Sequence, residues 1–281
     1  MMKSKLLLSA GILVAIVGAS CAHRPAGSTQ VKDSPYVPAG YKLVWHDEFD
    51  SEVKALPDTT KWEYQLGGGG WGNHELQYYV PAVLGQDTVA FVEDGILNIV
   101  ARMPQTPVDG HKYLSARMNS KQNWTYGYFE ASLKMPVGCG TWPAFWMLPQ
   151  DVKSWPLDGE IDIMEHVGSH PDSILVTVHT QKYNHIIGTQ KGVHVITPHS
   201  QSQFHTYALE WTAQEIKGFI DGKQCFTYPN EGTGKEVWPF DAPFHLLLNQ
   251  AVGGGLGGLK GVDDACFPAV YQIGYVRVYQ K

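Results

Sequence analysis

Apolar and polar residues alternate along short segments of this chain. The segment 128–135 has apolar residues at every second position, and the segment 96–102 alternates in the same way after Asp94 and Gly95, which favour a turn. Successive side chains of a strand point to opposite faces, so this period predicts strands with one buried face. Further strands are predicted at 141–148, 174–180, 204–211, 216–220, 244–248 and 271–279.

The same pattern bears on the number of domains. No segment beyond the first twenty residues has a sustained helical period, and Asp221-Gly222 is typical of a hairpin turn. The chain has no internal repeat and no second shift in composition. We therefore predict one all-β domain over residues 39–281, built as a β-sandwich.

The segment 155–167 contains three acids within a strand-like, β-branched run. On a strand, Glu160 and Asp162 share one face while the isoleucines beside them point into a core. A regular strand would not place Glu165 on that acidic face. One extra residue, a β-bulge around Ile163–Met164, returns Glu165 to the face of Glu160, and bulges are frequent next to active sites.

Three acids on one face repel one another. Like-charged neighbours raise at least one pKa, so that one carboxylic acid stays protonated near neutral pH while another is ionised. Retaining glycoside hydrolysis needs this division between an acid/base and a nucleophile about 5–5.5 Å apart. The alternative interpretation of this segment alone is a solvated acidic face on an antiparallel strand.

Two tryptophans precede the acidic strand by a short loop. If 141–148 is a strand, Trp142 and Trp146 lie on the same face. Consecutive antiparallel strands are usually neighbours in space, so both rings are expected beside the carboxylates. Flat rings stack on the C–H faces of sugars, which makes this pair a plausible sugar platform. Burial of one or both rings in the core is the alternative.

Composition narrows the function classes. The chain has 281 residues and a net charge of −6, with no basic patch, so nucleic acid is not an expected partner. Hydrophobic residues make up 43% of the chain, enough for a well-packed domain. Nine tryptophans and fourteen tyrosines exceed what a core usually needs, which indicates that some are exposed for ligand stacking.

Residues 1–20 have the pattern of a secretory signal peptide. Lys3 and Lys5 form a basic start, and the apolar run 6–17 is too short for an ordinary membrane span. The run ends in small residues before Cys21, which resembles a bacterial lipoprotein signal with Cys21 as the lipidated residue. Gly18 departs from that signal, since a leucine-like residue is usual there, so cleavage nearby without lipidation is the alternative.

The segment 22–38 is rich in Pro, Ser and Ala, which predicts a flexible tether. We expect an exported protein, lipid-anchored through Cys21 at the bacterial cell envelope or outer-membrane surface, with no other membrane contact. Apart from Cys21, the chain has Cys139, Cys225 and Cys266. Their spacing gives no disulfide framework, so one disulfide and none are both open.

The Glu-x-Asp-x-x-Glu arrangement of Glu160, Asp162 and Glu165 resembles the signature of glycoside hydrolase family 16. The resemblance covers nearly all of residues 41–280. Supporting segments are 45–50, 71–79, 115–117, 126–130, 142–146, 178–180, 204–207, 249–254 and 275–279. The bulged spacing resembles the branch of laminarinases, agarases and related galactanases, rather than the lichenase branch.

The resemblance implies a β-jelly-roll of two curved antiparallel sheets, with a substrate cleft across the concave one. It also implies endo-acting hydrolysis of a β-linked polysaccharide with retention of configuration. The expected substrate is a β-1,3-glucan or a mixed β-1,3/1,4-glucan. By that resemblance Glu160 is the nucleophile, Glu165 is the acid/base, and Asp162 positions Glu160. We expect a monomer that needs no cofactor.

Other cleft residues follow from the resemblance. Trp142 and Trp146 are expected to stack on sugars near the scissile bond. Asn73, Arg117 and His179 are expected to hydrogen-bond sugar hydroxyls. Trp71 and Trp124 are expected to wall the ends of the cleft. A structural role is the alternative for each of these side chains.

Two positions depart from the family pattern. Leu256 stands in a glycine loop where many β-1,3-glucanases have a tryptophan, which leaves room for another β-glycan. Gly274 stands where an aspartate usually binds a calcium on the convex face, so calcium is expected to bind weakly or not at all.

Three other functions compete with a β-glucanase. The alternative enzyme is an endo-β-galactosidase acting on mucin-type O-glycans or marine galactans, which the absent loop tryptophan favours. A non-catalytic carbohydrate-binding module has no need for Glu160 and Glu165 together. A metal hydrolase using Glu165, His166 and His170 is disfavoured, because on a strand His166 faces away from Glu165.

Overall fold

The computed structural model describes residue 31 and residues 33–281. The predicted signal peptide, Cys21 and most of the predicted tether lie outside the described residues. Ser34–Lys281 form one compact unit, which begins within the last residues of the segment 22–38. In it, Ser34 is buried and its hydroxyl donates a hydrogen bond to Glu130 Oε2 at 2.8 Å.

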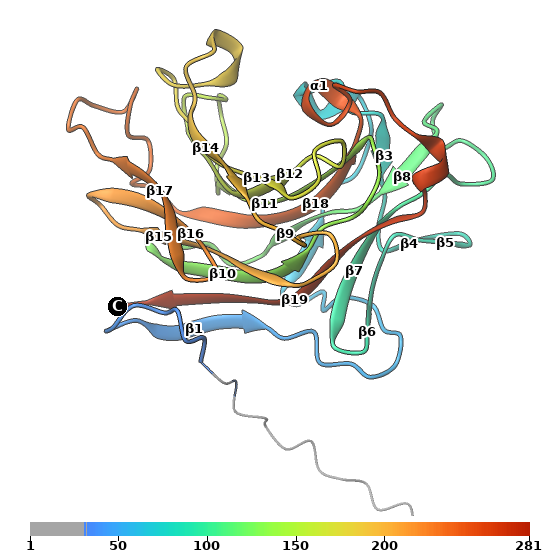
Figure 1. Cartoon of the computed structure of the whole chain (residues 1–281), viewed down its shortest axis with the longest axis horizontal. Coiled ribbons are helices and arrows are strands. Elements are labelled where there is room, and N and C mark those ends of the chain that lie inside the picture. Colours follow the sequence, from blue (N-terminus) through green and yellow to red (C-terminus); the bar gives the residue numbers. More distant parts are fainter. Residues whose placement is uncertain (1–30, 32) are drawn as a thin grey trace, which may run out of the picture. The chain divides into compact units, whose positions relative to one another are not determined.

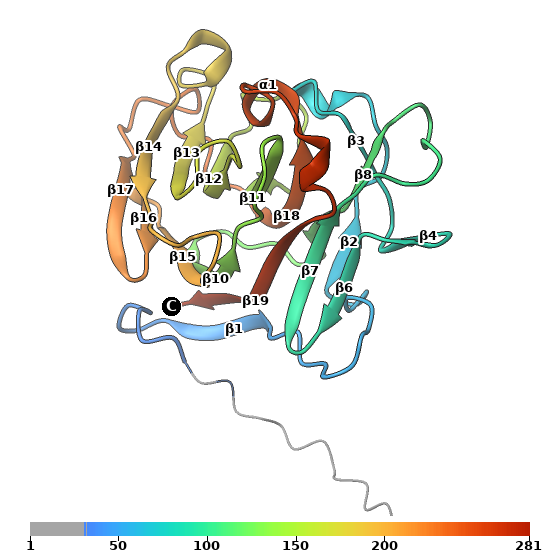
Figure 2. The same ribbon diagram turned by 45° about the vertical axis from the view of Figure 1, so that its right-hand side comes forward.

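Two large sheets pack face to face (Figures 1 and 2). The first sheet contains, in spatial order, β17 (Lys223–Pro229), β16 (Glu215–Ile220), β15 (His205–Trp211), β10 (Gly127–Lys134), β19 (Ala269–Gln280), β7 (Ile96–Ala101) and β6 (Ala90–Glu93), with β1 (Lys42–Asp47) pairing β19. The second sheet contains β14 (Lys191–Ile196), β13 (Ser173–His179), β12 (Glu160–His166), β11 (Thr141–Pro149), β18 (Phe244–Val252), β9 (Arg117–Ser120) and β2 (Trp62–Tyr64). All pairings within these two sheets are antiparallel, as the jelly-roll prediction requires.

Smaller elements complete the fold. Two short pairs are β3 (Gln77–Tyr79) with β8 (Tyr113–Ser115), which are parallel, and β4 (Val83–Leu84) with β5 (Asp87–Thr88). The helical turns are η1 (Gly70–Gly72), η2 (His185–Ile187), α1 (Gly254–Gly257) and η3 (Asp264–Cys266). No helix among the described residues is long and apolar enough to cross a membrane.

The core lies between the two sheets, and the alternation predicted for 128–135 is confirmed. Phe129, Ala131 and Leu133 on β10 are fully buried in it. The facing side chains come from β11, β12, β13 and β18 of the second sheet, including Phe145 and Leu248. The outer face of that second sheet is therefore not part of the core and is available to bind a ligand. In Figure 1, α1 lies on the side of this outer face, whereas β1 lies on the opposite side of the molecule.

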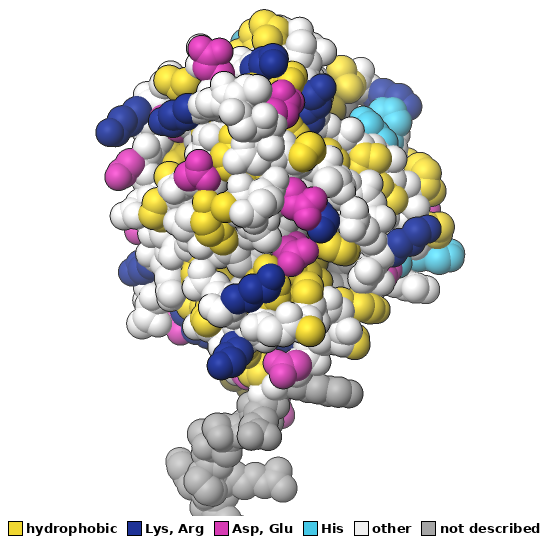
Figure 3. Space-filling view, turned by 90° about the vertical axis from the view of Figure 1, so that its left-hand side faces the viewer, with side chains coloured by type: hydrophobic (Ala, Val, Ile, Leu, Met, Phe, Trp, Pro, Cys, Tyr) yellow, Lys and Arg dark blue, Asp and Glu magenta, His cyan; other side chains and the backbone are white. Residues whose placement is uncertain are grey.

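Surface charge is mixed on the face over β15–β17. Figure 3 shows acidic and basic side chains interspersed there with apolar and polar ones. The described cysteines Cys139, Cys225 and Cys266 are all free thiols.

Candidate active site

A β-bulge on β12 sets the direction of the three acids. Opposite β11, Phe145 pairs with Met164 and Trp146 pairs with Asp162, so Ile163 is the extra residue. The register against β13 shifts at the same place, between Asp162 and Glu165. Ile163 and Met164 are both buried in the core, whereas Glu165 returns to the outer face with the other two acids. The predicted bulge is confirmed.

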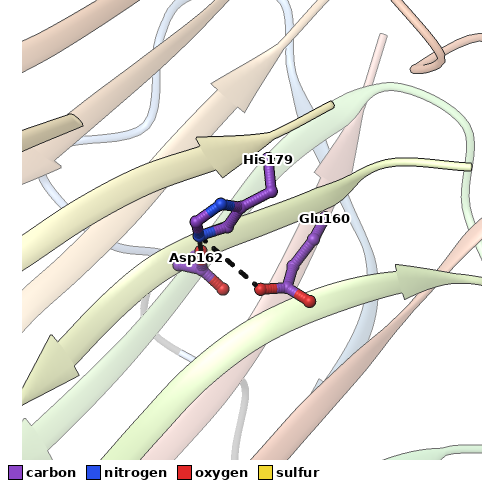
Figure 4. Close-up of side chains that lie close together, drawn as sticks. All are labelled: Glu160, Asp162 and His179. Carbon is purple, nitrogen blue, oxygen red and sulfur yellow. Dashed lines mark ion pairs between the residues drawn. The ribbon is translucent and has the colours of Figure 1, made fainter. Parts of the chain in front are cut away.

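Each acid has its own polar neighbour. Trp155 Nε1 donates a hydrogen bond to Glu160 Oε2 at 2.9 Å, and Trp142 Nε1 donates one to Glu165 Oε1 at 2.9 Å. His179 Nε2 lies 3.3 Å from Asp162 Oδ2 and 3.8 Å from Glu160 Oε1, as Figure 4 shows. Glu160 and Glu165 thus each accept a hydrogen bond from a tryptophan, and Glu160 and Asp162 share the contact with His179.

Burial makes the ionised forms of these acids costly. It raises the pKa of Glu160 well above its usual range, and the neighbouring Asp162 raises it further. Burial and the charge of Glu165 raise the pKa of Asp162, and burial raises the pKa of Glu165. The group therefore retains protons at a pH where isolated carboxylates have lost them, which gives it a carboxylic acid that can donate a proton.

The acids lie at the junction of two adjoining hollows. The hollows have volumes of about 470 and 370 Å³ and share the lining residues Asn73, Trp142, Glu160, Glu165 and His185. Because they share these residues, they form one cleft that runs past the acids on both sides. An open cleft of this kind admits a chain at its middle, whereas a closed pocket admits only an end.

One side of the cleft is built from β13, β14 and α1. Its lining includes Thr177, Gln190, His194 and Leu256. Leu256, the residue that departs from the family pattern, thus faces the cleft. Gly257 packs directly against Trp142, because a Cβ atom at Gly257 would lie 2.8 Å from Trp142 Cβ. The α1 turn therefore buttresses the tryptophan that contacts Glu165.

The other side of the cleft contains a cation between two tryptophans. The guanidinium carbon of Arg117 lies 4.7 Å from the ring centroid of Trp71 and 4.7 Å from that of Trp146. Such cation–π contacts stabilise all three side chains. Arg117 is only 8% exposed, but it still lines the hollow beside Asn249.

A buried carboxylate anchors this side. Glu75 accepts hydrogen bonds from Gln77 Nε2 at 2.6 Å, Tyr79 Oη at 3.3 Å and Asn73 Nδ2 at 3.4 Å. Tyr79 Oη in turn accepts one from Asn249 Nδ2 at 3.0 Å. Asn249 Oδ1 accepts one from Trp146 Nε1 at 2.7 Å. This relay couples two predicted sugar contacts, Asn73 and Trp146, through one buried anion.

Nine of the ten predicted catalytic and substrate-binding residues line or adjoin this cleft. They are Glu160, Asp162, Glu165, Trp142, Trp146, Asn73, Arg117, His179 and Trp71. Trp124 does not, and this corrects its predicted place at the end of the cleft. It is 3% exposed and packs edge-on against Trp45 and Phe129 in the core. Its position before a strand start gave no sign of which way the ring would point.

Trp155, Glu75, His185 and Asn249 are cleft residues that were not predicted. Trp155, Glu75 and Asn249 stood inside segments already singled out, 155–167, 71–79 and 249–254, so the sequence did point to their neighbourhood. His185 lies on η2 and packs against Trp155 with a ring-centroid separation of 5.0 Å. A short polar loop without a motif gave no reason to select it.

The histidines of the metal-hydrolase alternative lie elsewhere. His166 is fully buried on the core side of β12, and its Nδ1 lies 3.0 Å from the carbonyl oxygen of Ser173. It therefore points away from Glu165. Among the described residues, the group that could hold a metal ion is Glu160, Asp162 and His179.

Comparisons with known proteins agree with this geometry. A family model described as glycosyl hydrolases family 16 matches residues 78–256. A β-glucanase from Rhodothermus marinus is 46% identical, over 99% of this chain and 96% of that protein. A glucan endo-1,3-β-glucosidase A1 from Niallia circulans is 34% identical over 94% of this chain, which spans 42% of that longer protein.

A solved structure gives the same result in three dimensions. The X-ray structure of the laminarinase from Rhodothermus marinus superposes with a TM-score of 0.80 and 49% identity, covering 85% of this chain and 97% of that one. The bulged strand, the paired tryptophans and the open cleft thus occur in a chain whose sequence and fold match one enzyme family throughout. The chain belongs to the glycosyl hydrolases family 16.

Proposed function

We propose that this protein is an endo-acting, retaining hydrolase of a β-1,3-glucan or a mixed β-1,3/1,4-glucan. The observation that carries the proposal is the arrangement of Glu160, Asp162 and Glu165 on one bulged strand, at the junction of two adjoining hollows that form one cleft. The relatives named as a β-glucanase, a glucan endo-1,3-β-glucosidase and a laminarinase support the substrate class.

In the first step, protonated Glu165 gives its proton to the glycosidic oxygen while ionised Glu160 attacks the anomeric carbon. The C–O bond to the leaving sugar breaks, and an ester between Glu160 and the sugar forms. The raised pKa of Glu165 keeps the proton available. Burial and Asp162 raise the pKa of Glu160 as well, whereas the hydrogen bond from Trp155 and the nearby His179 oppose that rise and so favour its anionic form.

In the second step, Glu165, now ionised, takes a proton from water as that water attacks the same carbon. The ester bond breaks and Glu160 leaves as a carboxylate. Two inversions give net retention. Asp162, placed beside Glu160 and His179, positions the nucleophile. Trp142 and Trp146 offer flat faces to the sugars on either side of the acids.

The test is product analysis of the purified protein on laminarin, mixed-linkage β-glucan, agarose-type galactan and mucin O-glycans. We expect oligosaccharides of mixed length from the two glucans, with the newly formed reducing ends first in the β configuration by NMR. Glu160→Gln is the blank. Products from galactan or mucin alone would move the enzyme to the endo-β-galactosidase alternative. Binding without cleavage would favour the carbohydrate-binding module.

The roles of the two glutamates can be separated with azide. In Glu160→Ala, azide attacks from the vacated face and should restore turnover of an activated aryl glycoside, giving an α-glycosyl azide. In Glu165→Ala, the covalent intermediate still forms with an activated leaving group, and azide should give a β-glycosyl azide. The opposite pairing of products would reverse the assigned roles.

We also propose export and lipid anchoring through Cys21, on the basis of the segment 1–21 alone. Metabolic labelling with a radioactive fatty acid should mark the wild-type protein and should not mark Cys21→Ser. If the serine variant is labelled equally, the anchor is not at Cys21.

A further inference from the structure

Three side chains of the cleft converge as a ligand set for a metal ion. Glu160, Asp162 and His179 each offer one donor atom, and these atoms all lie within 4.8 Å of one another. His179 Nε2 faces both carboxylates, at 3.3 Å from Asp162 Oδ2 and 3.8 Å from Glu160 Oε1 (Figure 4). The acids come from β12 and the imidazole from β13, so two paired strands fix the set.

A second observation points to a cation here. Asp162 is 2% exposed, and its Oδ2 atom is buried without accepting a hydrogen bond from the described residues. A buried carboxylate oxygen without a partner is costly. The same oxygen is the one that faces His179 Nε2. The set therefore contains a buried ligand atom that accepts no hydrogen bond from the described residues and that faces the His179 nitrogen.

The spacing fits a small tetrahedral ion. Zinc–ligand bonds of about 2.0–2.2 Å place neighbouring tetrahedral ligands roughly 3.3–3.6 Å apart. The two distances from His179 Nε2, 3.3 and 3.8 Å, lie at or close to this spacing, and all three donor atoms lie within 4.8 Å of one another. Glu160 lines both hollows of the cleft, so an ion can reach this set from the cleft.

We propose that Glu160, Asp162 and His179 form a site for Zn²⁺, and that Zn²⁺ bound there inhibits the enzyme. An imidazole and two carboxylates suit zinc, whereas Ca²⁺ and Mg²⁺ require six or more oxygen ligands or near-ideal octahedral coordination. The ion acts as an inhibitor and not as a cofactor, because it occupies the carboxylate that must attack the sugar. Inhibition of the enzyme by Zn²⁺ rests on the proposed function, in which Glu160 is the nucleophile, whereas binding of Zn²⁺ does not depend on it.

Binding is therefore measured first, without substrate. Chelator-stripped protein is titrated with Zn²⁺ in competition with a chromophoric zinc chelator. We expect one equivalent to bind at this site, and at least tenfold weaker binding in His179→Gln. The matched control is His194→Gln, which removes a histidine that lines the same cleft but lies outside the set. Asp162→Asn provides a second variant if His179→Gln does not fold, which circular dichroism will show.

Replacement of zinc by Co²⁺ gives a visible absorption spectrum that reports the coordination of the ion directly. Tetrahedral Co²⁺ absorbs strongly in the visible range, and this absorption should appear in the wild type and in His194→Gln but not in His179→Gln. An equal Zn²⁺ affinity in wild type, His179→Gln and Asp162→Asn would overturn the site. Equal losses in His179→Gln and His194→Gln would also overturn it.

Activity is measured second. Zn²⁺ should inhibit laminarin hydrolysis reversibly, added substrate should oppose the inhibition, and EDTA should restore the rate. Ca²⁺ and Mg²⁺ at the same concentration should have no effect. If Zn²⁺ binds through His179 without inhibition of a hydrolase that is active on laminarin, the inhibitory part of the proposal is wrong. If the protein hydrolyses no glycan while Zn²⁺ still binds through His179, the proposed function fails and the site remains.

Discussion

Trp155 Nε1 donates a 2.9 Å hydrogen bond to Glu160 Oε2, from a residue only five positions earlier in the chain. Between them, Asp158 accepts hydrogen bonds from the backbone nitrogens of Lys153 and Ser154, which folds the loop back toward the strand. The indole ring also packs against His185 and His179. A local turn and two distant histidines together fix the donor that favours the anion of the proposed nucleophile.

Trp155→Phe should therefore lower kcat/KM by roughly 10- to 100-fold. A hydrogen bond to a charged group contributes about 1.5–3 kcal/mol, and about 1.4 kcal/mol is tenfold in rate. Because the bond stabilises the ionised form, its loss raises the pKa of Glu160, and the acid limb of the pH profile moves to higher pH. The control is Trp238→Phe, which loses an indole hydrogen bond to Asp241 outside the cleft. Equal effects of the two changes would contradict this role.

Trp142→Phe should affect the other limb of the pH profile. Trp142 donates to Glu165, which lowers the pKa of that acid against the larger effect of burial. Without the donor the pKa of Glu165 rises, the proton is held to higher pH, and the alkaline limb of kcat/KM moves upward. The measurement is kcat/KM on a soluble β-glucan across pH. A downward movement would show that Glu165 is not the acid.

The relay through Glu75 predicts a binding defect for Tyr79→Phe. The tyrosine hydroxyl connects Asn249 with Glu75, and its removal leaves the Asn249 amide without that acceptor. Unfolding in urea should show a loss of about 1–3 kcal/mol. KM should rise more than kcat falls, because the relay holds Trp146 and Asn73 and not the three acids.

Tyr78→Phe is the matched control for Tyr79→Phe. The Tyr78 ring packs against His111, and its hydroxyl makes no hydrogen bond with the described residues. A similar rise of KM in both variants would mean that the relay has no part in substrate binding.

Two neighbouring glycines of the α1 region should differ in their tolerance of alanine. A Cβ atom at Gly257 would lie 2.8 Å from Trp142 Cβ, whereas the nearest atom at Gly255 would be 3.6 Å away. Gly257→Ala should cost about 1–3 kcal/mol through overpacking and should lower kcat/KM by displacing Trp142. Gly255→Ala should leave both nearly unchanged. The measurements are thermal unfolding and initial rates of both variants. Equal behaviour of the two variants would show that Gly257 does not support Trp142.

Calcium should not stabilise the protein. Arg277 donates from Nε and Nη2 to the two oxygens of Glu48 at 2.8 and 2.7 Å, and Gly274 on the same strand has no carboxylate to offer. We expect the same Tm in millimolar Ca²⁺ and in EGTA. A rise of several degrees with Ca²⁺ would show that a calcium site persists without the aspartate.

The sequence by itself determined the strands and the direction of the three acids. Both depend on a period of two, which local alternation records: Phe129, Ala131 and Leu133 are buried together, and the parity break at Ile163–Met164 is the observed bulge. The family motif on that strand and the neighbouring tryptophans could be predicted for the same reason. These features lie within a few residues of one another in the chain.

Only the tertiary structure decided how the cleft walls are held. Asn249 and Tyr79 are 170 positions apart, yet they form one link of the relay behind Trp146 and Asn73. Trp124 and Trp155 are the same kind of residue near a strand, but packing buried the first in the core and turned the second toward Glu160. Local sequence sets which face a side chain takes, whereas its partners depend on which distant strands pair with its own and in which register. That information is absent from any single segment.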